Sequence, residues 1–219
     1  MKVHKPLVIL GAGGHAKVLL SLVQSAGFNV FGVCDPILAD QKGGQWRGIS
    51  ILGGDAALEA LDPGSIELVN GLGQLVGGTA RQRIFQRLRA RGFRFPALVH
   101  PQAWVDSSAN LEEGVQIMAG AVIQADVIIG ANSIINTRAG IDHDCRLGED
   151  VHVAPGATLC GSVQVENGAF IGSGATVIQG LKVGMEAVVG AGATLTRNLD
   201  ARQVLLGPAG RKKDAPKED

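Results

Sequence analysis

An aliphatic residue recurs at every sixth position through the second half of this chain. The series runs from Val105 to Leu195, and all sixteen of its positions hold Ile, Leu or Val without a break in register. The residue four positions after each of them is small or of modest size. A period of six matches neither the repeat of an α-helix nor the alternation of a half-buried strand. The repeat therefore indicates a different architecture.

We interpret the repeat as a solenoid whose short strands form flat sides and turn a corner every six residues. Each aliphatic residue points inward and stacks on its equivalents in neighbouring coils, while Gly and Asn supply the turns. Glycine is abundant enough for this, at 32 of 219 residues, about twice its ordinary usage. If three sides make a coil of 18 residues, the 96 residues from Val105 to Asp200 form just over five coils.

The first hundred residues follow another pattern, in which short apolar strands alternate with helices. We expect strands at 7–10, 31–35, 67–73 and 93–100, helices at 14–27, 55–61 and 80–91, and a loop around Gly43 and Gly44. This alternation predicts a small Rossmann-like parallel sheet with a βαβ core. The sequence thus predicts an α/β domain over 1–100, an all-β parallel β-helix over 101–203 and a charged tail over 204–219.

Composition and charge exclude several classes of partner. The 20 Lys and Arg residues balance the 20 Asp and Glu residues, so no net field attracts nucleic acid or an anionic membrane. Eight aromatic residues are too few for base-stacking platforms, and no apolar run is long enough to span a membrane. The three cysteines (Cys34, Cys145 and Cys160) form no CxxC spacing. We expect a soluble protein of a reducing cytoplasm.

The first candidate site is the segment Gly11-Ala12-Gly13-Gly14-His15-Ala16, which follows the first strand and opens the first helix. Backbone N–H groups at such a position can hold phosphate, and Asp35 ends the next strand, where an acidic residue could meet a ribose hydroxyl. The domain is too small for a dinucleotide and a substrate together, so a single nucleotide or a nucleotide-linked sugar fits better. A dinucleotide oxidoreductase and a tight turn without a ligand remain alternatives.

The second candidate site surrounds His143, the third residue of its hexad, which should point outward from the solenoid wall. In a coil of 18 residues its stacking neighbours are Ala125 and Gly161, whose small size leaves a groove above and below the imidazole. Asp142 or Asp144 could hold a ring N–H and raise the basicity of the ring. An ideal strand would place both carboxylates on the opposite face, unless a turn lies beside His143. We favour a functional base over a solvated histidine.

Three features together resemble the hexapeptide-repeat sugar O-acyltransferase family: GAGGHAKVL near the start, INTRAGIDHDCRLGEDVHVAPGATLCG in the solenoid, and the layout in two parts. This family includes sialic acid O-acetyltransferases and N-acetyltransferases of nucleotide-linked 4-amino-6-deoxy sugars. The similarity extends from about Val8 to Leu206. It implies a left-handed β-helix, a homotrimer, acetyl-CoA as co-substrate in a groove between neighbouring solenoids, and a role in polysaccharide or glycan biosynthesis.

The resemblance also implies roles for individual residues. His143 matches the general base and Asp144 its supporting acid, and we add the N–H of Gly161 as the candidate donor to the oxyanion of the tetrahedral intermediate. Residues that match acetyl-CoA contacts are His152, Ser173 and Ala191. Residues expected to bind the nucleotide sugar are Gly13, Gly14, His15, Asp35, Pro36, Gly73 and Asn136. Pro36 departs from the family, whose members often carry a second acidic residue there.

A metal site is the other interpretation of the histidines. Some hexapeptide-repeat proteins are zinc-dependent carbonic anhydrases with three histidines, two of them five residues apart. In this chain His143 and His152 are nine residues apart, and the solenoid has no third histidine. We expect no metal. On the residues alone, His152 is equally consistent with a corner histidine that bonds a backbone carbonyl.

The function that these observations favour is transfer of acetyl from acetyl-CoA to the amino group of a nucleotide-linked 4-amino-6-deoxy sugar. In this mechanism neutral His143 removes a proton from the attacking amine. Three alternatives stay open: acetylation of a sugar hydroxyl, a protein that binds a nucleotide sugar or CoA without catalysis, and the nicotinamide oxidoreductase.

Overall fold

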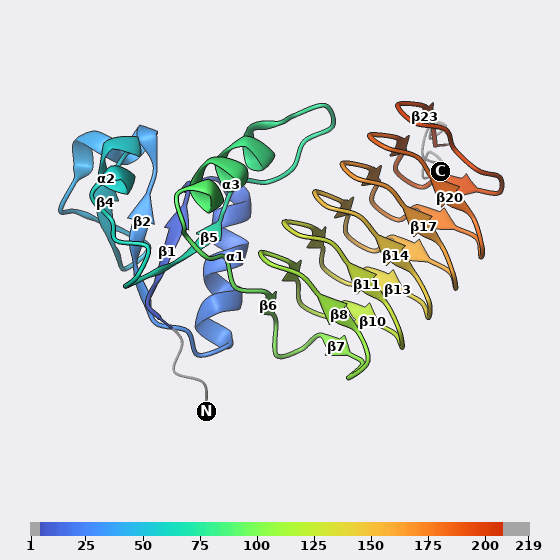
Figure 1. Ribbon diagram of the computed structural model, residues 1–219, viewed down its shortest axis with the longest axis horizontal. Helices are drawn as coiled ribbons and strands as arrows, with labels where there is room; N and C mark the ends of the chain where they lie inside the picture. Colours follow the sequence, from blue (N-terminus) through green and yellow to red (C-terminus); the bar gives the residue numbers. More distant parts are fainter. Residues whose placement is uncertain (1–4, 208–219) are drawn as a thin grey trace, which may run out of the picture.

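A computed structural model describes residues 5–207 of the chain and has two parts, an α/β domain and a β-helix that lie side by side (Figure 1). The α/β domain holds β1 (Leu7–Leu10), β2 (Val30–Cys34), β3 (Gln45–Trp46), β4 (Ile49–Gly53) and β5 (Glu67–Asn70) in the order β3-β4-β2-β1-β5. All pairs are parallel except β3 with β4. Because the chain adds strands on one side of β1 and then places β5 on the other, the strand order reverses between β1 and β5. A crevice opens at such a point.

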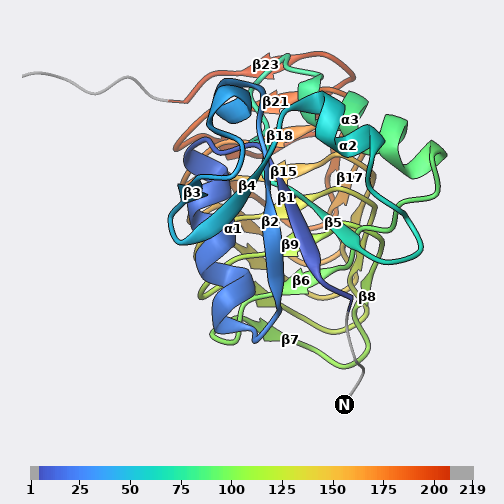
Figure 2. The same cartoon turned by 90° about the vertical axis from the view of Figure 1, so that its left-hand side faces the viewer.

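The helices cover both faces of this sheet: α1 (Gly14–Ser25), the 3₁₀ helix η1 (Pro36–Gln41), α2 (Asp55–Glu59) and α3 (Ala80–Ala90). Figure 2 shows α1 on one side, with α2 and α3 on the other. Two separate apolar clusters reflect this division, one around Leu19 and Leu22 of α1 and one around Phe85 and Leu88 of α3. The small Rossmann-like sheet predicted from the sequence is therefore confirmed.

One sequence-based expectation for this domain was incomplete and another was wrong. The loop expected around Gly43 and Gly44 is present, but it leads into the β3–β4 hairpin, which was not predicted, and β4 is a full member of the parallel sheet. The strand expected over 93–100 is limited to β6 (Leu98–Val99), which joins the β-helix instead. Pro96 interrupts this segment because it has no N–H to donate, and Phe95 before it is buried in the α3 cluster.

The β-helix consists of two-residue strands that form three parallel sheets. The sheet that faces the α/β domain, here called the docking sheet, contains β6, β9 (Gln116–Ile117), β12 (Ile134–Ile135), β15 (His152–Val153), β18 (Phe170–Ile171), β21 (Val188–Val189) and β23 (Val204–Leu205). The second sheet contains β7 (Trp104–Val105), β10 (Val122–Ile123), β13 (Gly140–Ile141), β16 (Thr158–Leu159), β19 (Thr176–Val177) and β22 (Thr194–Leu195). The third contains β8 (Asn110–Leu111), β11 (Ile128–Ile129), β14 (Arg146–Leu147), β17 (Gln164–Val165) and β20 (Lys182–Val183).

The strand register confirms the 18-residue coil. Ile123 pairs with Ile141, and Ile141 with Leu159, so each aliphatic residue stacks on its equivalent one coil away. These side chains fill one dry column through the left-handed β-helix. The third residue after every aliphatic position from Leu111 to Val189 has a positive φ, which makes each corner. Glycine occupies half of these corners, and Asp and Asn, which tolerate this conformation, occupy four more.

The α/β domain rests on the docking sheet. Ile134 of that sheet and Met118, which follows β9, belong to the same apolar cluster as α1, and β6 connects the two parts. The predicted domain boundaries at residues 100 and 203 stay predictions. β6 lies before the first boundary and β23 after the second, and both strands belong to the docking sheet. Residues 208–219 of the predicted tail lie outside the described residues. No helix within residues 5–207 is long and apolar enough to cross a membrane.

Candidate functional site

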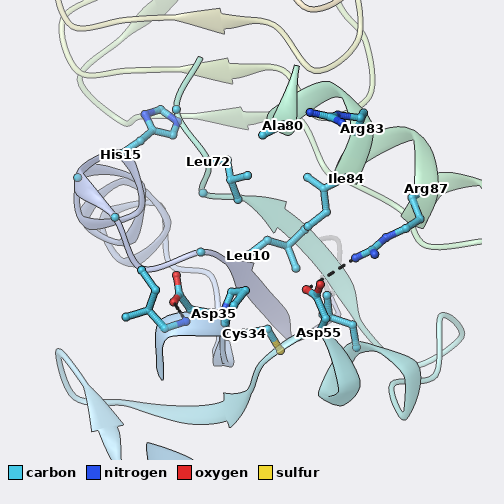
Figure 3. A pocket seen from close by; sticks show the side chains of 18 of the residues that line it. Leu10, His15, Cys34, Asp35, Asp55, Leu72, Ala80, Arg83, Ile84 and Arg87 are labelled. Carbon is cyan, nitrogen blue, oxygen red and sulfur yellow. Dashed lines mark hydrogen bonds and ion pairs between the residues drawn. The ribbon is translucent and has the colours of Figure 1, made fainter. Parts of the chain in front are cut away.

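A cleft of about 910 Å³ lies where β1, β2 and β5 end, bounded by α3 (Figure 3). It occupies the crevice that the sheet order predicts. Six of the seven residues expected to bind a nucleotide sugar line it: Gly13, Gly14, His15, Asp35, Pro36 and Gly73. Asn136 does not; it lies beside His152 on the β-helix, with its Nδ2 3.4 Å from the Nε2 of His152. The structure thus brings together most, but not all, of this predicted set.

The glycine-rich turn leaves its backbone open to the cleft. Gly13 is the N-cap of α1, and both Gly13 and Gly14 are exposed, with no atom within 4 Å of where a Cβ would be. An anion can therefore approach the unpaired N–H groups of the first helical turn, where the helix dipole also favours negative charge.

Asp35 shapes this turn. Its Oδ2 accepts a hydrogen bond from the backbone N–H of Ala12 at 2.7 Å, and its Oδ1 accepts from the N–H groups of Ile37 (2.7 Å) and Leu38 (3.3 Å). The carboxylate therefore ties the glycine-rich turn to the start of η1, where Pro36 occupies the first helical position. Contact between Asp35 and a ribose stays a prediction.

Two arginines of α3 complete the cleft. Arginine recurs at every fourth position along this helix, at Arg83, Arg87 and the C-cap Arg91, and the first two are exposed and line the cleft. Arg87 lies 3.8 Å from Asp55, the ion pair drawn in Figure 3. Arg91 pairs instead with Glu59, away from the cleft. The cleft therefore combines two cations with an open helix N-terminus.

His143 projects from the corner between the second and third sheets, and its side chain is 60% exposed. Asp144 follows with φ 60°, and this turn brings its Oδ2 to 2.8 Å from the Nδ1 of His143. The turn resolves the difficulty of an ideal strand, while Asp142 accepts the backbone N–H of His143 at 2.9 Å. A carboxylate only accepts, so Nδ1 carries the hydrogen and Nε2 holds the free lone pair. The hydrogen bond to Asp144, aided by the charge of Asp142, raises the pKa of His143.

Gly161 lies directly against this imidazole, one coil further on. A Cβ on Gly161 would lie only 2.7 Å from Cε1 and from Nε2 of His143. The absence of a side chain therefore creates the space that the ring occupies, as the 18-residue coil predicts. The exposed edge of the ring and the Gly161 backbone face the same space.

The residues expected to contact acetyl-CoA lie elsewhere on the prism. Ser173 and Ala191 are exposed at the corner between the docking sheet and the second sheet. His152 is buried in the docking sheet, with its ring centroid 4.7 Å from that of Phe170. Burial, with His15 and Arg81 nearby, lowers the pKa of His152 to about 4. In one chain, the second sheet therefore separates this predicted set from His143.

Sequence reasoning missed a polar network buried between the two parts. Arg81 is 3% exposed; its Nη1 donates to the carbonyls of Asn70 (2.8 Å) and Leu72 (2.7 Å), and its Nε to that of Asn132 (3.2 Å). Asn132 in turn donates to the carboxylate of Asp150 at 2.6 Å. The network fixes the loop that follows β5, which lines the cleft. Within residues 5–207 no cluster of three His, Cys, Asp or Glu side chains could hold a metal.

Comparison with known proteins matches the two parts separately. Residues 6–88 match the family model described as the PglD N-terminal domain. Residues 108–142 match the bacterial transferase hexapeptide model of six repeats, and residues 162–197 match the hexapeptide repeat of succinyl-transferase.

Solved structures match almost the whole chain. One is a histidine-to-asparagine mutant of perosamine N-acetyltransferase from Caulobacter crescentus in complex with CoA and GDP-perosamine. It is 36% identical, with a TM-score of 0.83, and the match covers 95% of this chain and 97% of that one. Another is the acetyltransferase domain of PglB from Neisseria gonorrhoeae in complex with acetyl coenzyme A, 32% identical, with a TM-score of 0.85 and coverage of 93% and 97%.

A curated relative matches over a shorter stretch. The GDP-perosamine N-acetyltransferase of Escherichia coli O157:H7 is 32% identical over 91 residues. This match spans 42% of the present chain and 41% of that protein.

Proposed function

The chain belongs to the hexapeptide-repeat sugar acyltransferase family, and from this premise we propose that it transfers acetyl from acetyl-CoA to the amino group of a nucleotide-linked 4-amino-6-deoxy sugar. One observation carries the proposal: an exposed imidazole is held by Asp144 on one side and faces a side-chain-free glycine on the other. This arrangement supplies a base and leaves room beside it for a thioester.

In the proposed reaction, the neutral amine of the sugar attacks the thioester carbonyl, and a C–N bond forms. Nε2 of His143 takes the proton that the amine loses, a step that contributes about 10²–10⁴-fold to the rate. Asp144 stabilises the imidazolium through Nδ1–H. The Gly161 N–H is the proposed donor to the oxyanion. As the C–S bond breaks, the proton passes from the imidazolium to the leaving thiolate, so that CoA departs as a thiol.

The cleft of the α/β domain is the proposed nucleotide-sugar site. The N–H groups at Gly13 and Gly14 suit the diphosphate, and Arg83 and Arg87 add positive charge on the opposite wall. GDP-perosamine is the ligand of the Caulobacter relative. For this chain we propose the same chemical class, a nucleoside diphosphate linked to an amino sugar.

We also propose that the active site requires a second copy of the chain. The α/β domain covers the docking sheet, whereas His143 projects from the corner opposite that sheet. A sugar held in the cleft therefore does not meet the His143 of its own chain. Cyclic association would bring His143 of one copy to the cleft and to the Ser173 corner of another, which supports the expected homotrimer. A place in glycan biosynthesis and a cytoplasmic location belong to this proposal too.

A thiol-release assay tests the proposal. Acetyl-CoA is offered with UDP-, GDP- and dTDP-linked 4-amino-6-deoxy sugars, and we expect thiol release with at least one of them and an amide in the product. An ester product would show that a sugar hydroxyl is the acceptor. Absence of thiol release with the whole panel, despite binding of acetyl-CoA, would contradict transfer to such sugars.

A further inference from the structure

A chain of three hydrogen-bonding groups crosses from the α/β domain to the β-helix behind the cleft. Nε2 of His15, on the second residue of α1, lies 2.8 Å from Oε1 of Gln116. Nε2 of Gln116 donates to the backbone carbonyl of Asn70 at 2.9 Å. Gln116 comes from β9 of the docking sheet and is 2% exposed. The contacts therefore connect a cleft residue to the wall of the β-helix.

The backbone carbonyl fixes the direction of every hydrogen bond in this chain. The oxygen of Asn70 only accepts, so the amide NH₂ of Gln116 must face it, and the amide oxygen must face His15. A flipped amide would place two acceptors together in a buried site, which costs about 1–3 kcal/mol. Because the amide oxygen only accepts, Nε2 of His15 must carry the hydrogen.

His15 is also held neutral. Burial and the charge of Arg81 lower the pKa of His15 to about 4. His15 also lies in the first turn of α1, where the positive end of the helix dipole disfavours a protonated imidazole. A neutral ring with its hydrogen on Nε2 has a free lone pair on Nδ1, and no group within residues 5–207 bonds to that atom.

We propose that Gln116 is a positioning residue that holds His15 in the Nε2–H tautomer, so that Nδ1 accepts a hydrogen bond from a hydroxyl or amino group of the nucleotide sugar. The nature of the ligand rests on the proposed function; the tautomer does not. Diphosphate oxygens carry no hydrogen at neutral pH and cannot pair with this lone pair. The diphosphate is therefore left to the helix N-terminus and the arginines, while His15 recognises a donor on the ribose or the sugar.

The tautomer is tested without turnover, by NMR of the full chain labelled with ¹⁵N-histidine. We expect His15 to show a protonated Nε2 and an unprotonated Nδ1 throughout the neutral pH range. In Gln116→Met, which removes both amide contacts, we expect the Nδ1–H form to appear beside it. Ser133→Ala is the matched control, because Ser133 is buried directly before β12 of the same sheet, but its hydroxyl bonds to Gly148 and Val151. The proposal would be overturned by a protonated Nδ1 in the wild-type protein. It would also be overturned by a mixture of tautomers in Ser133→Ala but not in Gln116→Met.

Two amide substitutions test the contact with the ligand. The Oδ1 of Asn occupies the place of the imidazole Nδ1, whereas the Nε2 of Gln occupies the place of the imidazole Nε2. Calorimetry with GDP-perosamine should show His15→Asn within about threefold of the wild-type affinity, and His15→Gln weaker by about tenfold or more. The reverse order would overturn the assignment of Nδ1.

Failure of this inference and failure of the proposed function are distinguishable. If no nucleotide sugar of the thiol-release panel, GDP-perosamine included, binds the wild-type protein, the ligand half of the inference is wrong together with that part of the proposed function. The NMR result still decides whether Gln116 fixes the tautomer. Conversely, if thiol is released but His15 is protonated on Nδ1, the proposed transferase activity is retained and the proposed positioning role of Gln116 is wrong.

Discussion

The His143 corner and the α/β cleft are built from different kinds of structure. At the corner, one imidazole projects from a repeat whose interior is aliphatic, and Gly161 one coil away leaves room for it. In the cleft, backbone groups and loop residues from several elements converge, and a buried polar network holds them. Substitutions at the corner should therefore affect the chemical step, whereas substitutions in the cleft should affect substrate binding.

The largest effect is expected at the base. His143→Ala should lower kcat about a hundredfold or more, because it removes the imidazole that takes the proton from the amine. The side chain is mostly exposed and bonds only to Asp144, so Tm and acetyl-CoA affinity should stay close to wild type. Steady-state thiol release and a thermal melt measure both. A wild-type kcat would remove His143 from the mechanism.

Gly161→Ala should have the next largest effect. The new methyl group would overlap Cε1 and Nε2 of His143, so the ring must move away from the attacking amine. We expect kcat to fall about tenfold or more, since small displacements of a catalytic group are costly. Gly140→Ala is the matched control for the imidazole position, because its Cβ would meet nothing within 4 Å. An unchanged His143 resonance in the Gly161 variant would contradict this steric account.

The cleft side of the comparison is tested by Arg83→Gln. Arg83 lines the cleft from an exposed position on α3, and its loss removes one charge opposite the helix N-terminus. We expect KM for the nucleotide sugar to rise about fivefold, with kcat and KM for acetyl-CoA unchanged. Arg94→Gln, which changes an exposed arginine outside the cleft, controls for the general loss of charge. A fall in kcat alone would break the division between the two regions.

The smallest effect is a shift in the pH profile. His143 acts as a base only when neutral, so activity is lost as pH falls through its pKa. Asp144 and Asp142 raise this pKa above the ordinary value. Asp144→Asn removes the larger contribution, so the acidic limb of kcat should move to lower pH. An acidic limb that stays at the same pH, or moves to higher pH, would show that Asp144 does not set the basicity of His143.

The sequence predicted the corner far better than the cleft. The six-residue period placed His143 on the outside and Gly161 beside it, because every coil repeats one geometry. It left open how Asp144 reaches the ring, and the answer is the positive φ that recurs at that place in every hexad from Gly114 to Gly192.

The buried network could not be predicted from the same pattern. Gln116 and Gln164 each precede an aliphatic residue of a two-residue strand, yet Gln116 is buried and Gln164 is exposed. The difference is only that the α/β domain covers one of three locally equivalent sheets. Which sheet it covers depends on long-range packing of α1 and α3, which no local period encodes. The role of Arg81, which bonds loop carbonyls, is equally invisible in a helix pattern.

Subunit complementation tests most directly the claim that the cleft and His143 act together only across two copies of the chain. His143→Ala removes the base, and Gly14→Trp fills the cleft from an exposed position where a side chain meets no neighbour. Each variant alone should be inactive. When the two are co-expressed with different tags and the mixed trimers are purified, about one of the three sites in each trimer combines an intact cleft with an intact His143 from another copy, and activity returns to about a third of the wild-type value. Mixed oligomers that stay inactive would contradict the account.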